Sequence, residues 1–198
     1  MTKDTENIRD AIVVYGASSE EISLNYKKAA QEVGRLIAES RHALVCGGGR
    51  AGLMKAAIDG ALQCGGTAIG VLPQFMIDNN WHHPELTHMI STPDMHSRKQ
   101  TMASMSCAAI ACPGGCGTFE ELFEIITWRQ LNLFHGQVII LNTDGYYNSI
   151  IEMFERAIAE GFMHADHRNL FTVANTPEEA VKAALEPAPA HLFSQKIH

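Results

Sequence analysis

Two glycine-rich segments constrain the fold of this chain more than any other feature of its sequence. The segment Gly47–Gly52 follows the short apolar run Ala43–Cys46, and the segment Gly114–Gly117 follows the apolar run Cys107–Cys112. A helical pattern begins directly after each segment. A buried strand that ends in a glycine turn and continues into a helix is typical of parallel α/β sheets, in which ligands bind at the carboxyl ends of the strands. We therefore expect both segments to lie at the ligand-binding edge of such a sheet.

The rest of the chain repeats this alternation of apolar runs and helical patterns. Strands are expected over Ala11–Tyr15, Ala43–Cys46, Thr67–Leu72, Leu86–Ile90, Cys107–Cys112, Val138–Leu141 and Leu170–Val173. Helices are expected over Ile22–Glu39, Leu53–Gln63, Ser97–Ser106, Phe119–Leu131, Tyr146–Glu160 and Thr176–Leu185. The polar segment Gln74–Glu85 predicts a loop. This pattern indicates a single doubly wound, Rossmann-like α/β domain, a parallel sheet flanked by helices, with a core at about 11–185 and a tail at 186–198.

Length and composition agree with one globular domain and argue against several classes of protein. The chain has 198 residues, 46% of them hydrophobic and 19% charged, and its formal net charge is −7. General nucleic-acid-binding proteins neutralise phosphates with Lys and Arg, so this negative charge disfavours that class. No apolar run approaches the roughly 20 residues of a membrane span, and the polar start lacks the pattern of a signal peptide. We expect a cytoplasmic protein that binds neither nucleic acid nor membrane.

The cysteines and histidines do not form a recognisable disulfide or metal framework. The five cysteines contain no C-x-x-C pair, and their odd number favours a reducing compartment. The groupings His82-His83 and His164-Ala165-Asp166-His167 lack the further ligands that a zinc site needs. We expect no metal and no other cofactor.

The first glycine segment matches the dinucleotide fingerprint G-x-G-x-x-G at Gly47, Gly49 and Gly52. A Rossmann site for NAD also needs an acidic residue at the end of the next strand, and the sequence there is Val71-Leu72-Pro73-Gln74. The lysine of a P-loop is absent as well. We interpret the segment as a phosphate cradle without NAD. The alternative is a strand-to-helix turn in which the glycines serve packing alone.

The second glycine segment leads into a group of carboxylates. Thr118 and Glu121 have the T-x-x-E spacing of a helix capping box, and the helix dipole also favours acidic side chains such as Glu120 and Glu124 near a helix start. Spacing alone therefore favours a structural role for Glu121. The open glycine turn before it favours a catalytic or binding role.

Arg98 and Lys99 form a basic pair at the start of another predicted helix. If Ser97 caps that helix, both cations lie in its first turn and oppose its dipole. Residues placed against local preference are expected where a site needs them, and a phosphate or the Glu121 carboxylate would compensate the charge. The alternative is a basic turn exposed to solvent.

Several of these segments together resemble the LOG ("Lonely Guy") family, earlier labelled possible lysine decarboxylases and associated with cytokinin riboside 5′-monophosphate phosphoribohydrolases. They are GGGRAGLM at 47–54, DMHSRK at 94–99, PGGCGTFEE at 113–121, ITW at 126–128, LNTDGYYN at 141–148 and EGF at 160–162. The resemblance runs from about Val13 to Ala184. It implies a Rossmann-like homodimer that cleaves the N-glycosidic bond of an adenosine 5′-monophosphate, often N6-substituted, to free base and ribose 5-phosphate.

The resemblance also implies roles for individual residues. Arg98 and Glu121 would form the catalytic pair. The implied substrate-binding residues are Ser18, Gly48, Lys99, Gly114, Gly115, Gly117, Thr118, Glu120 and Thr127. The family commonly has a glutamate at the position of Asn80 and a bulkier residue at that of Cys116, so these two positions bear on base preference.

The implied chemistry agrees with these residue types. Cleavage of a ribosyl C–N bond passes through an oxocarbenium-like state, which a carboxylate such as Glu121 can stabilise while it positions or deprotonates water. Arg98 would hold the phosphate or ribose, or keep Glu121 ionised.

Other functions stay open. The enzyme could act mainly on plain AMP, or the chain could be a non-catalytic nucleotide or molybdenum-cofactor carrier, since molybdenum-cofactor carriers look similar in fold. A carrier need not keep both Arg98 and Glu121. Decarboxylation of lysine is disfavoured, because a pyridoxal enzyme needs a Schiff-base lysine in a dedicated site and only Lys99 lies near a motif.

Overall fold

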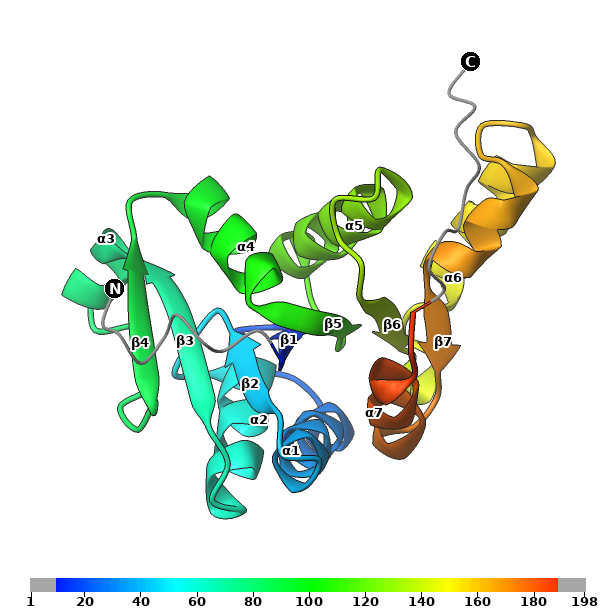
Figure 1. The fold of residues 1–198 in the computed structure, drawn as a ribbon. Coiled ribbons are helices and arrows are strands. Elements are labelled where there is room, and N and C mark those ends of the chain that lie inside the picture. The colour runs from blue at the N-terminus through cyan, green and yellow to red at the C-terminus, as the bar shows by residue number, and fades with distance from the viewer. Residues whose placement is uncertain (1–9, 189–198) are drawn as a thin grey trace.

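The computed structural model describes residues 10–188, in which seven strands form one sheet (Figure 1). The spatial order is β4-β3-β2-β1-β5-β6-β7, and every neighbouring pair is parallel. The strands are β1 (Ala11–Tyr15), β2 (Ala43–Cys46), β3 (Ala68–Pro73), β4 (His88–Thr92), β5 (Ser106–Ala111), β6 (Gln137–Leu141) and β7 (Thr172–Ala174). The predicted doubly wound, Rossmann-like sheet is confirmed.

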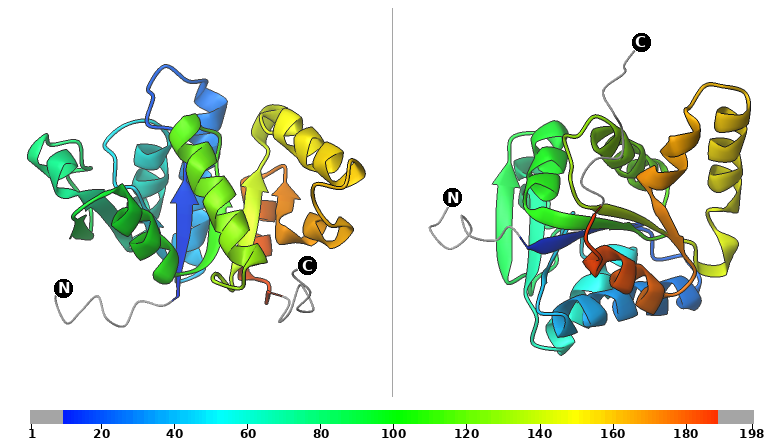
Figure 2. Two further views of the ribbon diagram at one scale, coloured as in Figure 1. Left: turned by 90° about the horizontal axis from the view of Figure 1, so that it is seen from above. Right: turned by 45° about the vertical axis from the view of Figure 1, so that its right-hand side comes forward.

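Helices cover both faces of the sheet, as the views in Figure 2 show. They are α1 (Leu24–Glu39), α2 (Gly52–Gln63), α3 (Gln74–Asp78), α4 (Met95–Ser104), α5 (Cys116–Gln130), α6 (Asn148–Ala159) and α7 (Pro177–Leu185). Two 3₁₀ turns, Thr143–Gly145 and Ala165–Leu170, flank α6. One core cluster contains residues of α1, α2 and α7, and the other contains residues of α4, α5 and α6.

Strand β1 shows why the sheet must be covered on both sides. Ile12 and Val14 belong to the first core cluster, whereas Val13 and Tyr15 belong to the second. Successive side chains of a strand point to opposite faces, so an all-apolar strand requires a helical layer on each face. The continuous apolar run of β1 therefore requires that this strand lie inside the sheet, with helices on both faces.

Some predicted boundaries differ from the structure. The segment predicted as a loop at Gln74–Glu85 contains the short helix α3, which follows Pro73 and includes a hydrogen bond of 2.9 Å from the Gln74 amide to the Asp78 carboxylate. Strand β4 lies two residues later than predicted. Helix α5 begins at Cys116, three residues earlier than predicted, because the glycine turn itself enters the helix.

No helix within residues 10–188 is long and apolar enough to cross a membrane. Most of the predicted tail at 186–198 lies outside the described residues.

Candidate active site

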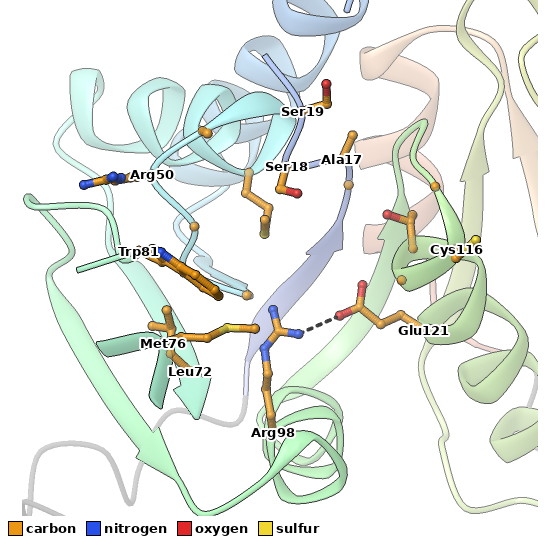
Figure 3. Close-up of a pocket in the computed structure, with 18 residues that line it drawn as sticks. Ala17, Ser18, Ser19, Arg50, Leu72, Met76, Trp81, Arg98, Cys116 and Glu121 are labelled. Atoms are coloured by element: carbon orange, nitrogen blue, oxygen red, sulfur yellow. Dashed lines mark hydrogen bonds and ion pairs between the residues drawn. The ribbon is translucent and has the colours of Figure 1, made fainter. Parts of the chain in front are cut away.

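A cavity of about 610 Å³ lies at the carboxyl edge of the sheet, where the segments that follow β1, β2 and β5 meet (Figure 3). The strand order reverses at β1, since β2 lies on one side of it and β5 on the other. Crevices at such a switch point are the usual ligand sites of open α/β sheets. The cavity is lined by Gly16, Ala17, Ser18, Ser19, Gly47, Gly49, Arg50, Ala51, Met54, Leu72, Met76, Trp81, Arg98, Gly115, Cys116, Gly117, Thr118 and Glu121.

Arg98 reaches the cavity from α4 and is held at both ends of its guanidinium. Its Nε donates to the Val71 carbonyl at 3.0 Å, and its Nη1 lies 3.4 Å from Oε1 of Glu121. The guanidinium also lies directly against the Gly47 backbone, so that a Cβ at position 47 would overlap Nη2. Gly47 is therefore required for Arg98 to occupy this place.

Glu121 faces Arg98 from the second turn of α5, and its side chain is 12% exposed. Burial raises the pKa of this carboxyl from its usual value of 4.5 to about 7, although the Arg98 charge acts in the opposite direction. A carboxyl with a pKa near 7 can exchange a proton readily at neutral pH, as a general acid or base must. The pair thus has the geometry and the electrostatics of an acid–base site.

The second glycine turn presents an open helix start to the cavity. Gly115 is the N-cap of α5 and offers no side-chain cap. The first N–H groups of a helix have no intrahelical partners and, with the helix dipole, favour an anion. A Cβ at Gly115 or Gly117 would meet no atom of the described chain within 4 Å, so packing does not explain these two glycines. Both glycines are exposed and border the open space of the cavity.

Two tyrosines brace this turn from behind. The Tyr146 hydroxyl donates to the Gly114 carbonyl at 2.6 Å, and the buried Tyr147 hydroxyl donates to the Cys112 carbonyl at 2.8 Å. Both tyrosines come from the 141–148 motif after β6. That motif therefore fixes the backbone that leads into α5.

The first glycine turn differs, because two of its N–H groups and that of Leu53, directly after it, are used within the chain. Gly48 N–H donates to Cys46 Sγ at 3.3 Å, Arg50 N–H to the Trp81 carbonyl at 3.0 Å and Leu53 N–H to the Ala17 carbonyl at 2.8 Å. Gly48 and Gly52 have positive φ angles of 67° and 65°. These contacts favour the packing interpretation of the first turn and place the free helix start at the second.

The structure brings together six of the predicted site residues on the cavity wall, namely Ser18, Arg98, Gly115, Gly117, Thr118 and Glu121. Gly48 and Gly114 adjoin the wall through their backbones. Lys99, Glu120 and Thr127 are not among the lining residues. Lys99 Nζ instead contacts Glu120 at 2.7 Å and Glu124 at 3.2 Å, and the Thr127 hydroxyl donates to the Phe123 carbonyl at 2.8 Å.

Both capping interpretations made from spacing are wrong. Helix α5 begins at Cys116, so Thr118 is its third residue and Glu121 its sixth, and they form no capping box. Helix α4 is capped by Asp94, whose carboxylate accepts the Ser97 N–H at 2.7 Å. Arg98 is thus the fourth helical residue rather than the first or second. The helix dipole acts less strongly on a cation at the fourth position.

The side of the cavity opposite Glu121 was not predicted from the sequence. Figure 3 shows Leu72, Met76 and Trp81 there, and Arg50 farther out. Arg50 lies in the glycine motif at 47–54, and the further signal in the sequence is a tryptophan within the polar segment 74–85. Only the fold places that segment across the cavity from α5.

No group of three or more metal-ligating side chains converges anywhere in residues 10–188. His83 pairs with Asp59 at 2.9 Å, and His164 lies 3.2 Å from Asp166, so one histidine of each grouping has a carboxylate partner. Arg98 and Glu121 are the paired charged side chains that line the cavity.

Comparison with known proteins shows the family of this chain. A family model described as "Possible lysine decarboxylase" matches residues 54–184. Cytokinin riboside 5′-monophosphate phosphoribohydrolase LOG3 of Arabidopsis thaliana is 38% identical over 91% of this chain and 84% of its own length. The chain belongs to the LOG family. A further member, the cytokinin riboside 5′-monophosphate phosphoribohydrolase of Rhodococcoides fascians, is 40% identical over 82% of each chain.

Solved structures share the fold of this LOG-family chain at lower identity. The Moco carrier protein of Chlamydomonas reinhardtii superposes with a TM-score of 0.68 at 26% identity, over 88% of this chain and 95% of that chain. The molybdenum cofactor binding protein of Rippkaea orientalis gives the same TM-score at 24% identity and the same coverage. The phosphoribohydrolases are therefore much nearer in sequence than the carriers.

Proposed function

We propose that this protein hydrolyses the N-glycosidic bond of adenosine 5′-monophosphates, including N6-substituted ones, to the free base and ribose 5-phosphate. The observation that carries the proposal is the Arg98–Glu121 pair within a cavity that also receives the open start of α5. Membership of the LOG family supports the same reaction. No cofactor is required for it.

The polar wall suits the phosphate and the ribose. The 5′-phosphate would lie at the N–H groups of Gly115–Thr118, with the hydroxyl of Ser18 nearby. This position leaves C1′ of the ribose close to the Arg98–Glu121 pair. Glu121 then acts as a carboxylate that stabilises positive charge on the ribosyl ring and takes a proton from the attacking water.

The reaction is a substitution at C1′. The bond from C1′ to the base nitrogen breaks, the water oxygen bonds to C1′, and a proton is delivered to the departing base, so that one water is added across the bond. Arg98 orients the Glu121 carboxylate and favours its ionised form. Because both side chains are largely buried, their charges act on the transition state with little screening.

Lys99, Glu120 and Thr127 do not line the cavity, so their role in substrate binding is indirect. The Lys99 contacts with Glu120 and Glu124 connect those two helices. These contacts therefore fix the spacing between the helix of Arg98 and the helix of Glu121. The same two carboxylates leave Lys99 unsuited to Schiff-base chemistry.

A nucleotide carrier is the second candidate, because two solved molybdenum-cofactor proteins share the fold. Incubation of the protein with AMP, N6-prenyl-AMP and the corresponding nucleosides, diphosphates and triphosphates separates the two functions. Chromatography should show free base from the monophosphates only. Retention of every nucleotide intact, with measurable binding, would support the carrier. The relative rates on AMP and N6-prenyl-AMP decide whether the enzyme is mainly an AMP nucleosidase.

We propose a homodimer as the assembly. Support comes from large apolar side chains left about half exposed or more on α5, α6 and the segments that follow them: Phe123, Leu131, Leu133, Met153 and Phe162. Light scattering coupled to size-exclusion chromatography should give twice the chain mass of 21.7 kDa. A monomer at micromolar concentration would contradict this assembly.

We also propose a cytoplasmic location. The five cysteines lie in the described residues as free thiols, and three of them are buried or half-buried. Free thiols persist in a reducing compartment. Fractionation of cells that express the tagged protein would test the location.

A further inference from the structure

The apolar wall of the cavity contains a large aromatic side chain that the proposed chemistry does not yet use. Trp81 lines the cavity and is 49% exposed. In Figure 3 the indole lies with Met76 on one side of the cavity, Glu121 and Cys116 lie on the other, and the Arg98 guanidinium lies between them. An exposed indole beside a cavity offers a flat, apolar surface with a single polar edge.

The backbone of Trp81 is fixed by contacts with two neighbouring segments. Its N–H donates to the Met76 carbonyl at 3.0 Å, and its carbonyl accepts the Arg50 N–H at 3.0 Å. Gly49 and His82 form an antiparallel bridge, and the His83 N–H donates to the Gly48 carbonyl at 2.8 Å. The segment that bears Trp81 is thus tied to the first glycine turn.

A buried histidine anchors the same segment to α2. His83 is 3% exposed, its Nδ1 accepts the Glu85 N–H at 3.1 Å, and its Nε2 lies 2.9 Å from Oδ1 of Asp59. Because Nδ1 accepts, Nε2 carries the hydrogen and donates to Asp59. Phe75 also packs edge-on against the indole, with ring centroids 6.3 Å apart. The backbone that bears Trp81 is therefore anchored, and one edge of its ring packs against Phe75.

The two opposite walls of the cavity differ in polarity. The α5 wall offers N–H groups and the Glu121 carboxylate, whereas the opposite wall offers Trp81, Met76 and Leu72. A nucleoside monophosphate has the same polarity, since its phosphate and its planar base lie on opposite sides of the ribose. With the phosphate at α5 and C1′ beside Glu121, the base extends toward Trp81.

We propose that the indole of Trp81 is the stacking platform for the purine base. This inference rests on the proposed function, and it makes Trp81 the residue that selects a planar aromatic leaving group. Aromatic side chains stack on any base, so Trp81 favours purines through surface area and the Arg98–Glu121 pair supplies the reaction. The base stays on the indole in both the ground state and the transition state, so the contact stabilises both.

Steady-state kinetics test the platform. Trp81→Ala should raise KM for AMP about 10-fold, which corresponds to about 1.4 kcal/mol, while kcat changes less than about 2-fold, because uniform binding is lost. Trp81→Phe should recover most of the affinity, since a smaller ring still stacks. A Trp81→Ala enzyme with an unchanged KM, or with a loss confined to kcat, would overturn the inference.

Fluorescence tests the same contact without catalysis. The chain has two tryptophans, and Trp128 packs against the second core cluster, away from the cavity lining. In a Trp128→Phe variant, whose unfolding midpoint is checked first, Trp81 is the sole indole. Adenine should quench its emission in a saturable way, and ribose 5-phosphate, which lacks a base, should not.

The outcomes also separate this inference from the proposed function. Adenine quenching without base release from AMP would retain the platform and overturn the hydrolase. Base release from AMP, with no quenching by adenine and an unchanged KM in Trp81→Ala, would retain the hydrolase and overturn the platform. Equal quenching by ribose 5-phosphate and adenine would also overturn it, because the indole would then report the phosphate end.

Discussion

The Nη1 atom of Arg98 lies 3.4 Å from Oε1 of Glu121, and the two side chains are only 8% and 12% exposed. They come from different helices, 23 residues apart in the chain. Arg98 is additionally fixed by the Val71 carbonyl on β3, so the pair joins the two halves of the sheet at the point where its strand order reverses.

Replacing Glu121 with Gln should abolish base release while the fold is kept. The amide has the same shape but cannot take a proton from water, and loss of general-base action costs about 10²- to 10⁴-fold in kcat. Chromatographic assay of free adenine measures the loss. Activity within 10-fold of wild type would contradict the catalytic role.

The same variant should show a pH-dependent gain in stability. The folded state raises the pKa of Glu121 to about 7, so it favours the protonated form, and this contribution is present below about pH 4.5 and lost as the pH rises through 7. Glu121→Gln should therefore unfold at or above the wild-type temperature at pH 8 and show no such advantage at pH 5. Thermal unfolding followed by circular dichroism at both pH values tests this expectation.

The pH dependence of wild-type activity should follow the Glu121 carboxyl. Because the reaction needs the carboxylate, kcat/KM should fall as the pH drops below about 7. Profiles recorded between pH 5 and 9 give the midpoint. Glu155→Gln, at an exposed carboxylate paired with Arg168, is the matched control and should leave the midpoint unchanged. A wild-type midpoint near pH 4.5 would contradict the raised pKa of Glu121.

Replacing Gly47 with Ala should impair activity through Arg98. The added Cβ would overlap Nη2 of Arg98 and force the guanidinium away from Glu121. We expect kcat/KM to fall at least about 10-fold, approaching the effect of Arg98→Ala, and the double variant to lose little more. Independent, multiplicative losses in the double variant would show that Gly47 acts in another way.

Replacing Gly117 with Ala should weaken substrate binding without lowering the stability of the fold. A Cβ there meets no atom of the described chain within 4 Å, and Ala favours a helix over Gly by about 0.5–1 kcal/mol, so the unfolding midpoint should hold or rise. The same Cβ would enter the space assigned to the phosphate and raise KM for AMP. An unchanged KM would place the phosphate elsewhere in the cavity.

Local sequence signals predicted the strands and most helices well. The apolar runs of β1, β2 and β5 can be covered only by helices on both faces, and that requirement is visible in the residues themselves. Local sequence specifies the start of a helix less closely. Asp94 and Ser97 are both good N-caps, and the sequence gives no means of choosing between them.

The sequence by itself determined a parallel sheet with two glycine turns at its carboxyl edge, because strand burial and turn flexibility are local properties. The tertiary structure decided what those turns do. The Trp81 carbonyl accepts the N–H of Arg50 in the first turn and the Ala17 carbonyl accepts that of Leu53 after it, whereas the start of α5 has no side-chain cap. Likewise, Arg98 and Glu121 form a pair, and Trp81 lines the cavity, only when segments distant in the sequence pack together. These hydrogen bonds and this burial depend on partners far along the chain, which come together only in the folded structure.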